Sequence, residues 1–208
     1  MIRAGSQPLT IIIPFGIMVA MDNRTRLLNC ALELFTARGY DAVGVQEIVD
    51  SAGVTKPSLY HYFSSKHGLL DALLKDHFEE LNAAVQEAAC YEHDLPGTLQ
   101  NLALVYFNFA QKHPSFYRMQ MSMQFASPEC ESYQSVLPYS LEQYELLENL
   151  FAGAALDHGN MRGRQRAYAV TFLGMLNTYI AMFLNGYAEL GDTLVYQATH
   201  QFMHGIFS

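Results

Sequence analysis

The side chains best suited to chemistry in this chain stand on a short segment that begins at Thr55. Thr55 can cap the start of a helix, and Pro57 fits its first turn, because the N–H that proline lacks has no helical partner there. Such a helix would expose four polar side chains, namely Lys56, Ser58, Tyr60 and His61. Lysine neutralises phosphate, while hydroxyl and imidazole groups hydrogen-bond phosphates or base edges. The segment therefore predicts a surface that contacts DNA.

A second short helix, from about Val45 to Ala52, is needed to hold that surface in place. Gly53 supplies the left-handed turn between the two helices. The apolar positions that would lock the helices at their crossing angle are Ile48, Ala52, Val54 and Leu59. Residues 45–63 together predict a helix-turn-helix.

Apolar residues recur at helical spacing along almost the whole chain, so we expect an all-α fold with about nine helices. The pattern predicts one helix capped by Asp22 and stopped by Gly39, and another from Ser65 to about Ala89. Prolines and glycines then divide the remaining helices, expected near 96–112, 114–126, 138–156, 163–190 and 192–207. Residues 119–125 alternate like a strand, but no other segment offers a pairing strand, and we predict helix there too.

Composition and charge narrow the class of protein. Half of the 208 residues are apolar, 15% are charged, and the net charge is −8, which is a globular composition and excludes a uniformly basic nucleic-acid coat. Residues 21–75 hold six basic and six acidic side chains, whereas residues 76–208 hold five and fourteen. The N-terminal part is thus the better candidate to meet a polyanion.

Cysteine and histidine positions predict neither a disulfide framework nor a metal site. The three cysteines are widely spaced and lack a CxxC pair, which fits a reducing cytoplasm. His200 and His204 have a metal-compatible spacing, but no acidic or thiol partner adjoins them, and we interpret them as a polar or interface face. We expect no metal and no cofactor.

From Thr25 to Leu74 the chain resembles the DNA-binding domain of the TetR family of bacterial transcriptional regulators. The matching stretches are Ala31 to Phe35 with Gly39-Tyr40, Val45 to Ile48, Ala52 to Lys56, and Ser58-Leu59-Tyr60-His61-Tyr62-Phe63-Ser64-Ser65-Lys66 followed by Leu69-Leu70. The last string is the most specific. Two positions depart from the family pattern. Gly44 stands where a capping Thr or Ser is usual, and Val49 stands where a small Ala is usual.

The resemblance implies a homodimer that binds a palindromic operator, usually as a repressor, and that a small molecule releases by moving the long fourth helix. Two recognition helices must lie about 34–36 Å apart to enter successive major grooves, so a small pivot lowers affinity. Carried over, the DNA contacts are Lys56, Pro57, Ser58, Tyr60 and His61, with Lys66 pairing with a phosphate. The expected division is a helix-turn-helix domain at 21–67 and a ligand-binding and dimerisation domain at 68–208, with the dimer formed through about 163–207. Tyr62 is expected to pack against the first helix.

The middle of the chain is rich in Tyr, Phe and Met, which indicates either an ordinary core or a pocket for a hydrophobic or aromatic ligand. The candidate ligand-binding residues are Tyr106, Phe109, Phe116, Met119, Met123, Tyr144, Phe172, Met175 and Tyr179. Few basic residues occur there, so a strongly anionic ligand such as an acyl-coenzyme A is not favoured.

The longest uncharged run, residues 167–188, is long enough to cross a membrane. It has a small, polar stripe opposite a large apolar stripe, and we interpret it as a core or interface helix instead. Residues 1–20 have a weak signal-peptide shape. We expect an upstream extension there, disordered or not translated, because a well-formed helix start follows Met21.

Two other classes of function stay open beside the ligand-responsive regulator. One is a helical small-molecule carrier, and the other is a regulator with no small-molecule ligand. An enzyme is not expected, because the sequence shows no nucleophile triad spacing, glycine-rich phosphate loop or HExxH.

Overall fold

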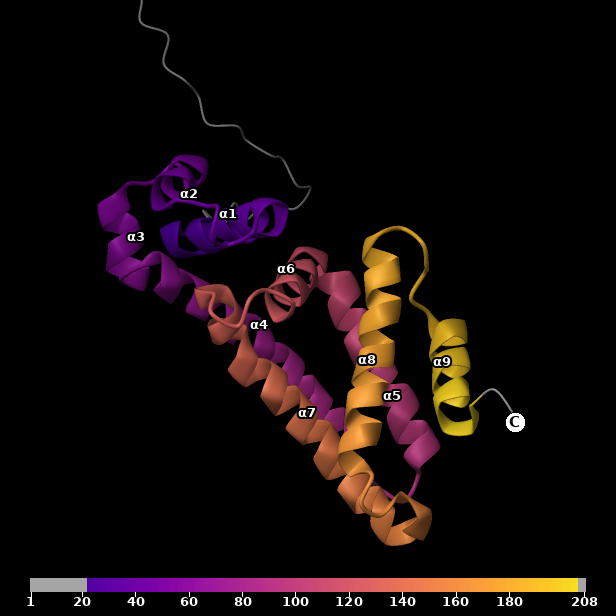
Figure 1. Cartoon of the computed structure of the whole chain (residues 1–208). Helices are drawn as coiled ribbons and strands as arrows, with labels where there is room; N and C mark the ends of the chain where they lie inside the picture. Colours follow the sequence, from indigo (N-terminus) through magenta and orange to yellow (C-terminus); the bar gives the residue numbers. More distant parts are fainter. Residues whose placement is uncertain (1–21, 206–208) are drawn as a thin grey trace, which may run out of the picture.

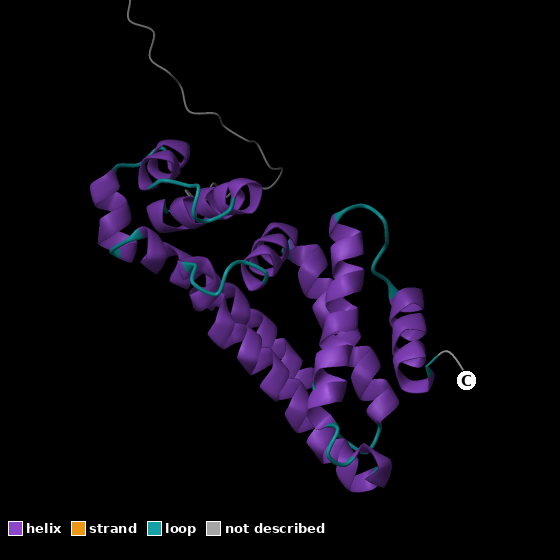
Figure 2. Ribbon diagram, in the orientation of Figure 1, coloured by secondary structure: helices purple, strands orange, loops and turns teal. Residues whose placement is uncertain are grey.

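The computed structural model describes residues 22–205, and in that range it confirms the all-α prediction (Figures 1 and 2). The elements are α1 (Asn23–Arg38), α2 (Val45–Ala52), α3 (Lys56–Phe63), α4 (Lys66–Ala88), α5 (Leu95–Lys112), α6 (Pro114–Gln124), α7 (Glu131–Asp157), the 3-10 turn η1 (Gly159–Met161), α8 (Gln165–Leu184) and α9 (Asp192–His204). The expectations for residues 1–20 and for a last helix reaching 207 lie partly or wholly outside this range.

Figure 1 shows two groups of helices joined by α4. Helices α1 to α3 form a small unit at one end, and the first turns of α4 pack against it. The rest of α4 runs beside α7 and α5, while α8 packs on α7 and α9 lies at the outer edge. The small unit and the outer helices α8 and α9 therefore lie on opposite sides of the molecule.

Local signals explain the helices of the small unit. The carboxylate of Asp22 accepts a hydrogen bond from the N–H of Thr25 at 2.7 Å, as an N-cap should. Gly39 ends α1 with a φ of 78°. The unit closes over a core in which Leu27, Ile48 and Leu59 are each fully buried. The three helices are thereby fixed relative to one another.

The turn from α3 into α4 depends on a close approach of two backbones. Ser65 caps α4, and its hydroxyl accepts a hydrogen bond from the N–H of Gly68 at 2.9 Å. A Cβ on Gly68 would lie 2.0 Å from the carbonyl oxygen of Phe63, so only glycine fits. This tight joint transmits the direction of α4 to α3.

Two expected helix bounds need correction. Helix α7 begins at Glu131, not near 138, and carries Pro138 inside it. Proline removes one hydrogen bond of a helix, and burial of Ser132 and Val136 ahead of it offsets the loss. Helix α8 ends at Leu184, because the chain turns at Gly186 with a φ of 77°. The doubtful stretch 119–125 is helical up to Gln124, as predicted.

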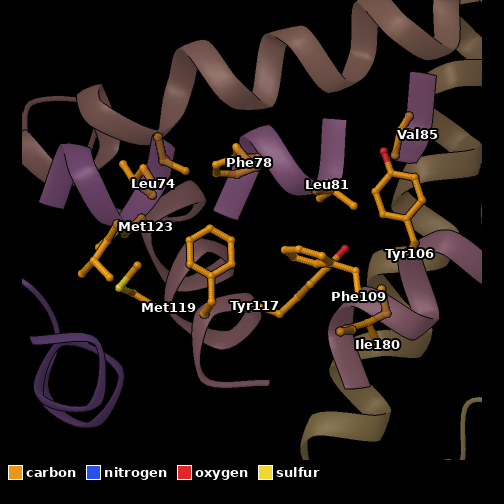
Figure 3. Close-up of a cluster of buried hydrophobic side chains, with 14 of the residues drawn as sticks. Leu74, Phe78, Leu81, Val85, Tyr106, Phe109, Tyr117, Met119, Met123 and Ile180 are labelled. Atoms are coloured by element: carbon orange, nitrogen blue, oxygen red, sulfur yellow. The ribbon is translucent and has the colours of Figure 1, made fainter. Parts of the chain in front are cut away.

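The larger group of helices is held together by a cluster of buried side chains (Figure 3). The cluster draws from four helices: Leu74, Phe78, Leu81 and Val85 of α4, Tyr106 and Phe109 of α5, Tyr117, Met119 and Met123 of α6, and Ile180 of α8. Each of these side chains is at most 6% exposed. Helix α6 thus lies at the meeting point of the core and the small N-terminal unit, which it contacts through α1.

Candidate nucleic-acid interface and interior cavity

Helix α3 presents its polar side chains outward because two apolar residues anchor its other face. Leu59 and Phe63, four residues apart, are buried against the small unit. On the opposite face Lys56, Pro57 and His61 are exposed, and Tyr60 is 47% exposed. Ser58 is half-buried at the edge of this face. The structure thus brings together on one surface the five α3 residues that the sequence marks for DNA contact.

The turn before α3 has the geometry that the sequence predicts. Gly53 adopts a left-handed conformation, with φ 62° and ψ 37°, which favours glycine. Thr55 occupies the N-cap position of α3, but its hydroxyl makes no capping hydrogen bond within residues 22–205. The exposed Thr55 side chain therefore lies at the N-terminus of α3, where the helix dipole favours anions.

Lys66, predicted to pair with a phosphate, has internal partners in this structure. Its ammonium donates to the carbonyl oxygens of Tyr40 and Val43, each at 3.1 Å, and lies 4.0 Å from the centroid of the Tyr40 ring. Lys66 thus ties the start of α4 to the loop between α1 and α2. An ammonium has three N–H donors, so one remains beyond these two bonds.

Tyr62 does not pack against α1 as expected. Its side chain is 42% exposed, and its ring meets the ring of His61 edge-on at 5.1 Å. Burial of the neighbouring Phe63 turns Tyr62 away from the core. The exposed surface of α3 therefore carries a third aromatic ring, beside those of Tyr60 and His61.

The two departures from the family pattern have different consequences. Val49 is accommodated, since it is 1% exposed within the small core. At Gly44 the N–H donates to Glu47 at 2.9 Å, and Arg38 donates to the other oxygen of the same carboxylate at 2.5 Å. The Gly44 N–H, with help from Arg38, holds the pKa of Glu47 below its usual range. A carboxylate thus occupies the start of α2, where a phosphate would otherwise be favoured.

Arg26 is a candidate DNA contact that the sequence analysis did not single out. Its side chain is exposed, and its guanidinium reaches to 2.9 Å from where a Cβ on Gly53 would be. None of the ion pairs among the described residues uses it, whereas Arg24 pairs with Asp76 at 3.2 Å. Its place on α1 gave no signal, because only the folded chain brings it beside the helix-turn-helix turn.

A small cavity lies between α4, α5, α6, α7 and α8. Its volume is about 20 Å³, and its walls are formed by Phe78, Leu81, Tyr106, Tyr117, Gln120, Gln124, Ser140, Gln143, Tyr144, Leu173 and Asn177. Only Tyr106 and Tyr144 of the predicted ligand-binding residues are among them. A space of this size holds about one water molecule.

The other predicted ligand-binding residues lie elsewhere, so the structure does not form one pocket from all nine. Phe109, Phe116, Met119 and Met123 are buried core residues beside the cavity. Phe172 packs with Phe151 and Phe202 in a separate aromatic group. Met175 and Tyr179 line a groove on the outer face of α8. These residues lie on helices, as predicted, but their side chains face different parts of the molecule.

The cavity wall is more polar than the sequence suggested. The hydroxyl of Tyr117 donates to Asn177 Oδ1 at 2.6 Å, and Tyr106 donates to Gln143. Burial raises the pKa values of Tyr106 and Tyr117, so both hydroxyls keep their protons at neutral pH. The sequence analysis missed the amides, since these partners are 37 or 60 residues apart in the chain.

The outer face of α8 and α9 lacks a partner among residues 22–205. Val170, Met182 and Tyr196 are 47%, 40% and 60% exposed. Among the described residues, α8 is the one helix long and apolar enough to cross a membrane, and 28% of its most apolar window is buried. A groove of about 680 Å³ follows this face, between α8 and the end of α9. Exposed apolar area of this kind marks a surface that another molecule covers.

Polar contacts join the small unit to the helices around the cavity. Thr36 of α1 donates to the carbonyl oxygen of Ser115 at 3.0 Å, and the Ser115 hydroxyl donates to Glu33 at 3.1 Å. Tyr40 donates to Glu131 at 2.5 Å, at the start of α7. Both Ser115 and Glu131 belong to the helices that line the cavity, so movement there reaches the small unit directly.

Comparisons with known proteins agree with this geometry. Residues 27–73, from α1 into α4, match the family described as "Bacterial regulatory proteins, tetR family". The chain is 39% identical over 98 residues to the transcriptional activator FasR of Mycolicibacterium smegmatis, a match covering 47% of this chain and 45% of that protein. It is 38% identical over 79 residues to the repressor KstR2 of Rhodococcus jostii, covering 38% and 39%. The chain thus matches less than half the length of these relatives.

Solved structures share the whole fold at lower identity. A Clostridium perfringens putative fatty acid metabolism regulator superposes with a TM-score of 0.75 at 20% identity, covering 88% of this chain and 99% of that one. The Bacillus subtilis regulator FadR in complex with stearoyl-CoA gives 0.72 at 16% identity, covering 87% and 98%. At sequence identities of 20% and 16%, the structural similarity shows that the fold is shared.

Proposed function

We propose that this chain is a ligand-responsive transcriptional regulator of the TetR family of bacterial regulatory proteins, the family that residues 27–73 match. It binds a palindromic operator as a homodimer, acts as a repressor, and leaves the DNA when a small organic molecule binds inside it. The observation that carries the proposal is the outward polar face of α3, held on a buried apolar face within the segment that matches the family.

The DNA contacts come from α3 and its surroundings. Tyr60, His61 and Ser58 can hydrogen-bond base edges or phosphates, and Pro57 can make apolar contact in the groove. Lys56 supplies charge for a phosphate, and Lys66 uses its remaining N–H donor in the same way. We add Arg26 and Thr55, because both are exposed, Arg26 reaches the Gly53 turn, and Thr55 is the N-cap of α3.

The partner in the dimer is a second copy of the chain, packed on the outer face of α8 and α9. This face is an exposed apolar surface of the domain from residue 68 onward, which is the ligand-binding and dimerisation domain in this proposal. A twofold dimer places two copies of α3 for two successive major grooves. The same burial accounts for the apolar α8 without a membrane and fits a regulator in the cytoplasm.

The experiment that tests the function is a titration against genomic fragments, including the region upstream of the gene itself, at two salt concentrations. Tyr60→Ala is compared with Phe125→Ala, which removes an 84% exposed aromatic ring at the end of α6. We expect tight, sequence-selective binding that Tyr60→Ala weakens at least about tenfold, the loss of about 1.4 kcal/mol of contact, and that Phe125→Ala retains. Weak binding, steeply salt-dependent and equal for all fragments, would instead favour the small-molecule carrier.

A further inference from the structure

We propose that the interior cavity and a surface groove between α4 and α7 are one effector site, closed by a latch that crosses between these helices. The site takes an uncharged ring molecule that carries hydrogen-bonding groups, of which phenol is the simplest. This inference rests on the proposed function, because it names the class of effector and the way in which the effector enters.

The latch consists of two contacts one helical turn apart. Phe78 of α4 and Tyr139 of α7 stack with ring centroids 4.7 Å apart and planes within 8°. Four residues further along each helix, the amide of Gln143 donates to Asn82 Oδ1. Phe78 and Gln143 line the cavity, whereas Tyr139 and Asn82 line the groove. The same two pairs therefore separate the cavity from the surface.

The groove outside the latch is large enough for a small organic molecule. Its volume is about 450 Å³, and it is lined by Lys75, Glu79, Asn82, Ala83, Gln86, Tyr139 and Glu142. The cavity inside the latch has about 20 Å³. The cavity alone is far smaller than the about 300–1,000 Å³ that is usual for ligand pockets, so an organic molecule in the groove can reach the cavity wall only if α4 and α7 part at the latch.

The cavity wall is built for hydrogen bonding, and three pairs of its polar side chains bond to one another: Tyr106 with Gln143, Tyr117 with Asn177, and Gln124 with Gln120. Of its eleven residues, three are apolar, namely Phe78, Leu81 and Leu173. Gln120 and Gln143 are each only 4% exposed, and Gln124 donates to Gln120 at 2.5 Å. Buried amides are costly unless they are paired. A ligand with its own donors and acceptors can take over these pairings, while a purely apolar ligand would leave the amides without partners.

Charge at the site selects against anions. None of the eleven side chains that line the cavity carries a full charge at neutral pH. At the groove, Lys75 lies 3.7 Å from Glu79, which leaves the negative charge of Glu142 without a cation in the lining. Like charges repel at a cleft mouth. A neutral molecule is therefore preferred over a polyanion such as the stearoyl-CoA found with the Bacillus subtilis FadR.

Opening the latch would act on the DNA-binding surface through α4. This helix begins two residues after α3 ends, and the backbones meet closely at Gly68. A displacement of α4 from α7 at Phe78 and Asn82 must therefore shift or strain the joint with α3. The latch thereby joins effector entry to the position of the recognition helix.

The test uses three ring molecules of similar size that differ in polarity and charge: phenol, toluene and benzoate. Isothermal titration of the full chain should show phenol binding at least about tenfold tighter than either toluene or benzoate, the difference expected for about one to two hydrogen bonds. Stearoyl-CoA should bind no better than benzoate. Absence of phenol binding, equal affinity for benzoate, or tighter binding of toluene would each overturn the inference.

Variants place the binding at the latch. Gln143→Leu should reduce the preference for phenol over toluene about tenfold, whereas Gln86→Leu, at an exposed position in the same groove, should leave it unchanged. Asn82→Ala, at a half-buried position outside the cavity lining, removes the bridge, leaves the amide of Gln143 free to meet a ligand, and should strengthen phenol binding. If Gln143→Leu does not fold, the test depends on Asn82→Ala alone. Unchanged or weaker phenol binding by that variant would contradict the latch.

The outcome separates this inference from the proposed function. Sequence-selective DNA binding without the phenol preference would leave the regulator standing and remove the effector class. A phenol preference that depends on Gln143, in a chain that binds no DNA selectively, would remove the regulator and leave the site.

Discussion

The surface of α3 and the cavity between α4 and α7 use similar side chains in opposite ways. On α3 the polar side chains point outward from a buried apolar face, so Tyr60 and His61 are exposed, and the ring of His61 meets that of Tyr62 rather than the core. Around the cavity Tyr106 donates to the buried Gln143, which in turn donates to Asn82 at the groove. Substitution of an exposed polar side chain should have little effect on stability, whereas substitution of a buried one should affect both stability and ligand binding. Substitutions should therefore separate DNA affinity from stability in one region and not in the other.

The largest effect should come from Gly68→Ala, at the joint between the two regions. The new Cβ would lie 2.0 Å from the carbonyl oxygen of Phe63, so α3 and α4 must separate. We expect a loss of about 2–4 kcal/mol in unfolding free energy, with selective DNA binding lost. Chemical denaturation measures the loss in unfolding free energy. Gly153→Ala in α7, whose Cβ meets Tyr91 at an ordinary 3.7 Å, should be neutral or stabilising by up to about 1 kcal/mol. A neutral Gly68→Ala would contradict the tight joint.

The next effect compares two tyrosines directly. Tyr106→Phe removes the hydroxyl that donates to the buried Gln143, and we expect a loss of about 1–3 kcal/mol in unfolding free energy. Tyr60→Phe removes an exposed hydroxyl and should change stability by less than about 0.5 kcal/mol while weakening DNA binding. Thermal unfolding and DNA titration of both variants test the contrast. Equal stability losses would show that the two regions do not differ as described.

Lys66→Met should show both kinds of effect at once. It removes the two hydrogen bonds to the carbonyls of Tyr40 and Val43, for which we expect about 1–2 kcal/mol of destabilisation. If the remaining donor meets a phosphate, the slope of log affinity against log salt should also fall by about 0.9. Arg26→Met should lower the slope equally without loss of stability. A Lys66→Met protein with an unchanged slope would restrict Lys66 to its structural role.

The smallest effect concerns pH and His77, which lies beside the cavity region. Burial is the main reason that the pKa of His77 is lowered, and His113 and Glu80 act on it with opposite signs. Because the unfolded chain then binds more protons, this contribution to stability is full above the ordinary histidine pKa near 6.5 and is lost as pH falls below it. His77→Phe, which keeps a ring stacked on Phe116, should unfold with a weaker dependence on pH between 7.5 and 5.5. If the variant and the wild type showed the same dependence of stability on pH, groups other than His77 would be its cause.

The same contrast explains how much could be read from the sequence. The helix-turn-helix was predictable, because Gly53, Leu59 and the exposed face of α3 lie within a short segment with its own local signals. The cavity was not, because the Gln143 to Asn82 pair joins residues 61 apart in the chain, and helical spacing does not say which two helices meet. Pro138 shows the same limit, since tertiary packing holds α7 through a residue that locally ends a helix.

The most direct test of the α3 surface is a DNA footprint that compares Tyr60→Ala with the wild-type protein. Thermal unfolding of both proteins should first give the same midpoint, so that a difference in the footprint does not arise from a loss of stability. We predict a protected site of twofold symmetry for the wild type, and loss of this protection at the same concentration for the variant, with unchanged stability. Equal protection by both proteins would contradict the assignment of the α3 surface as the DNA-binding face.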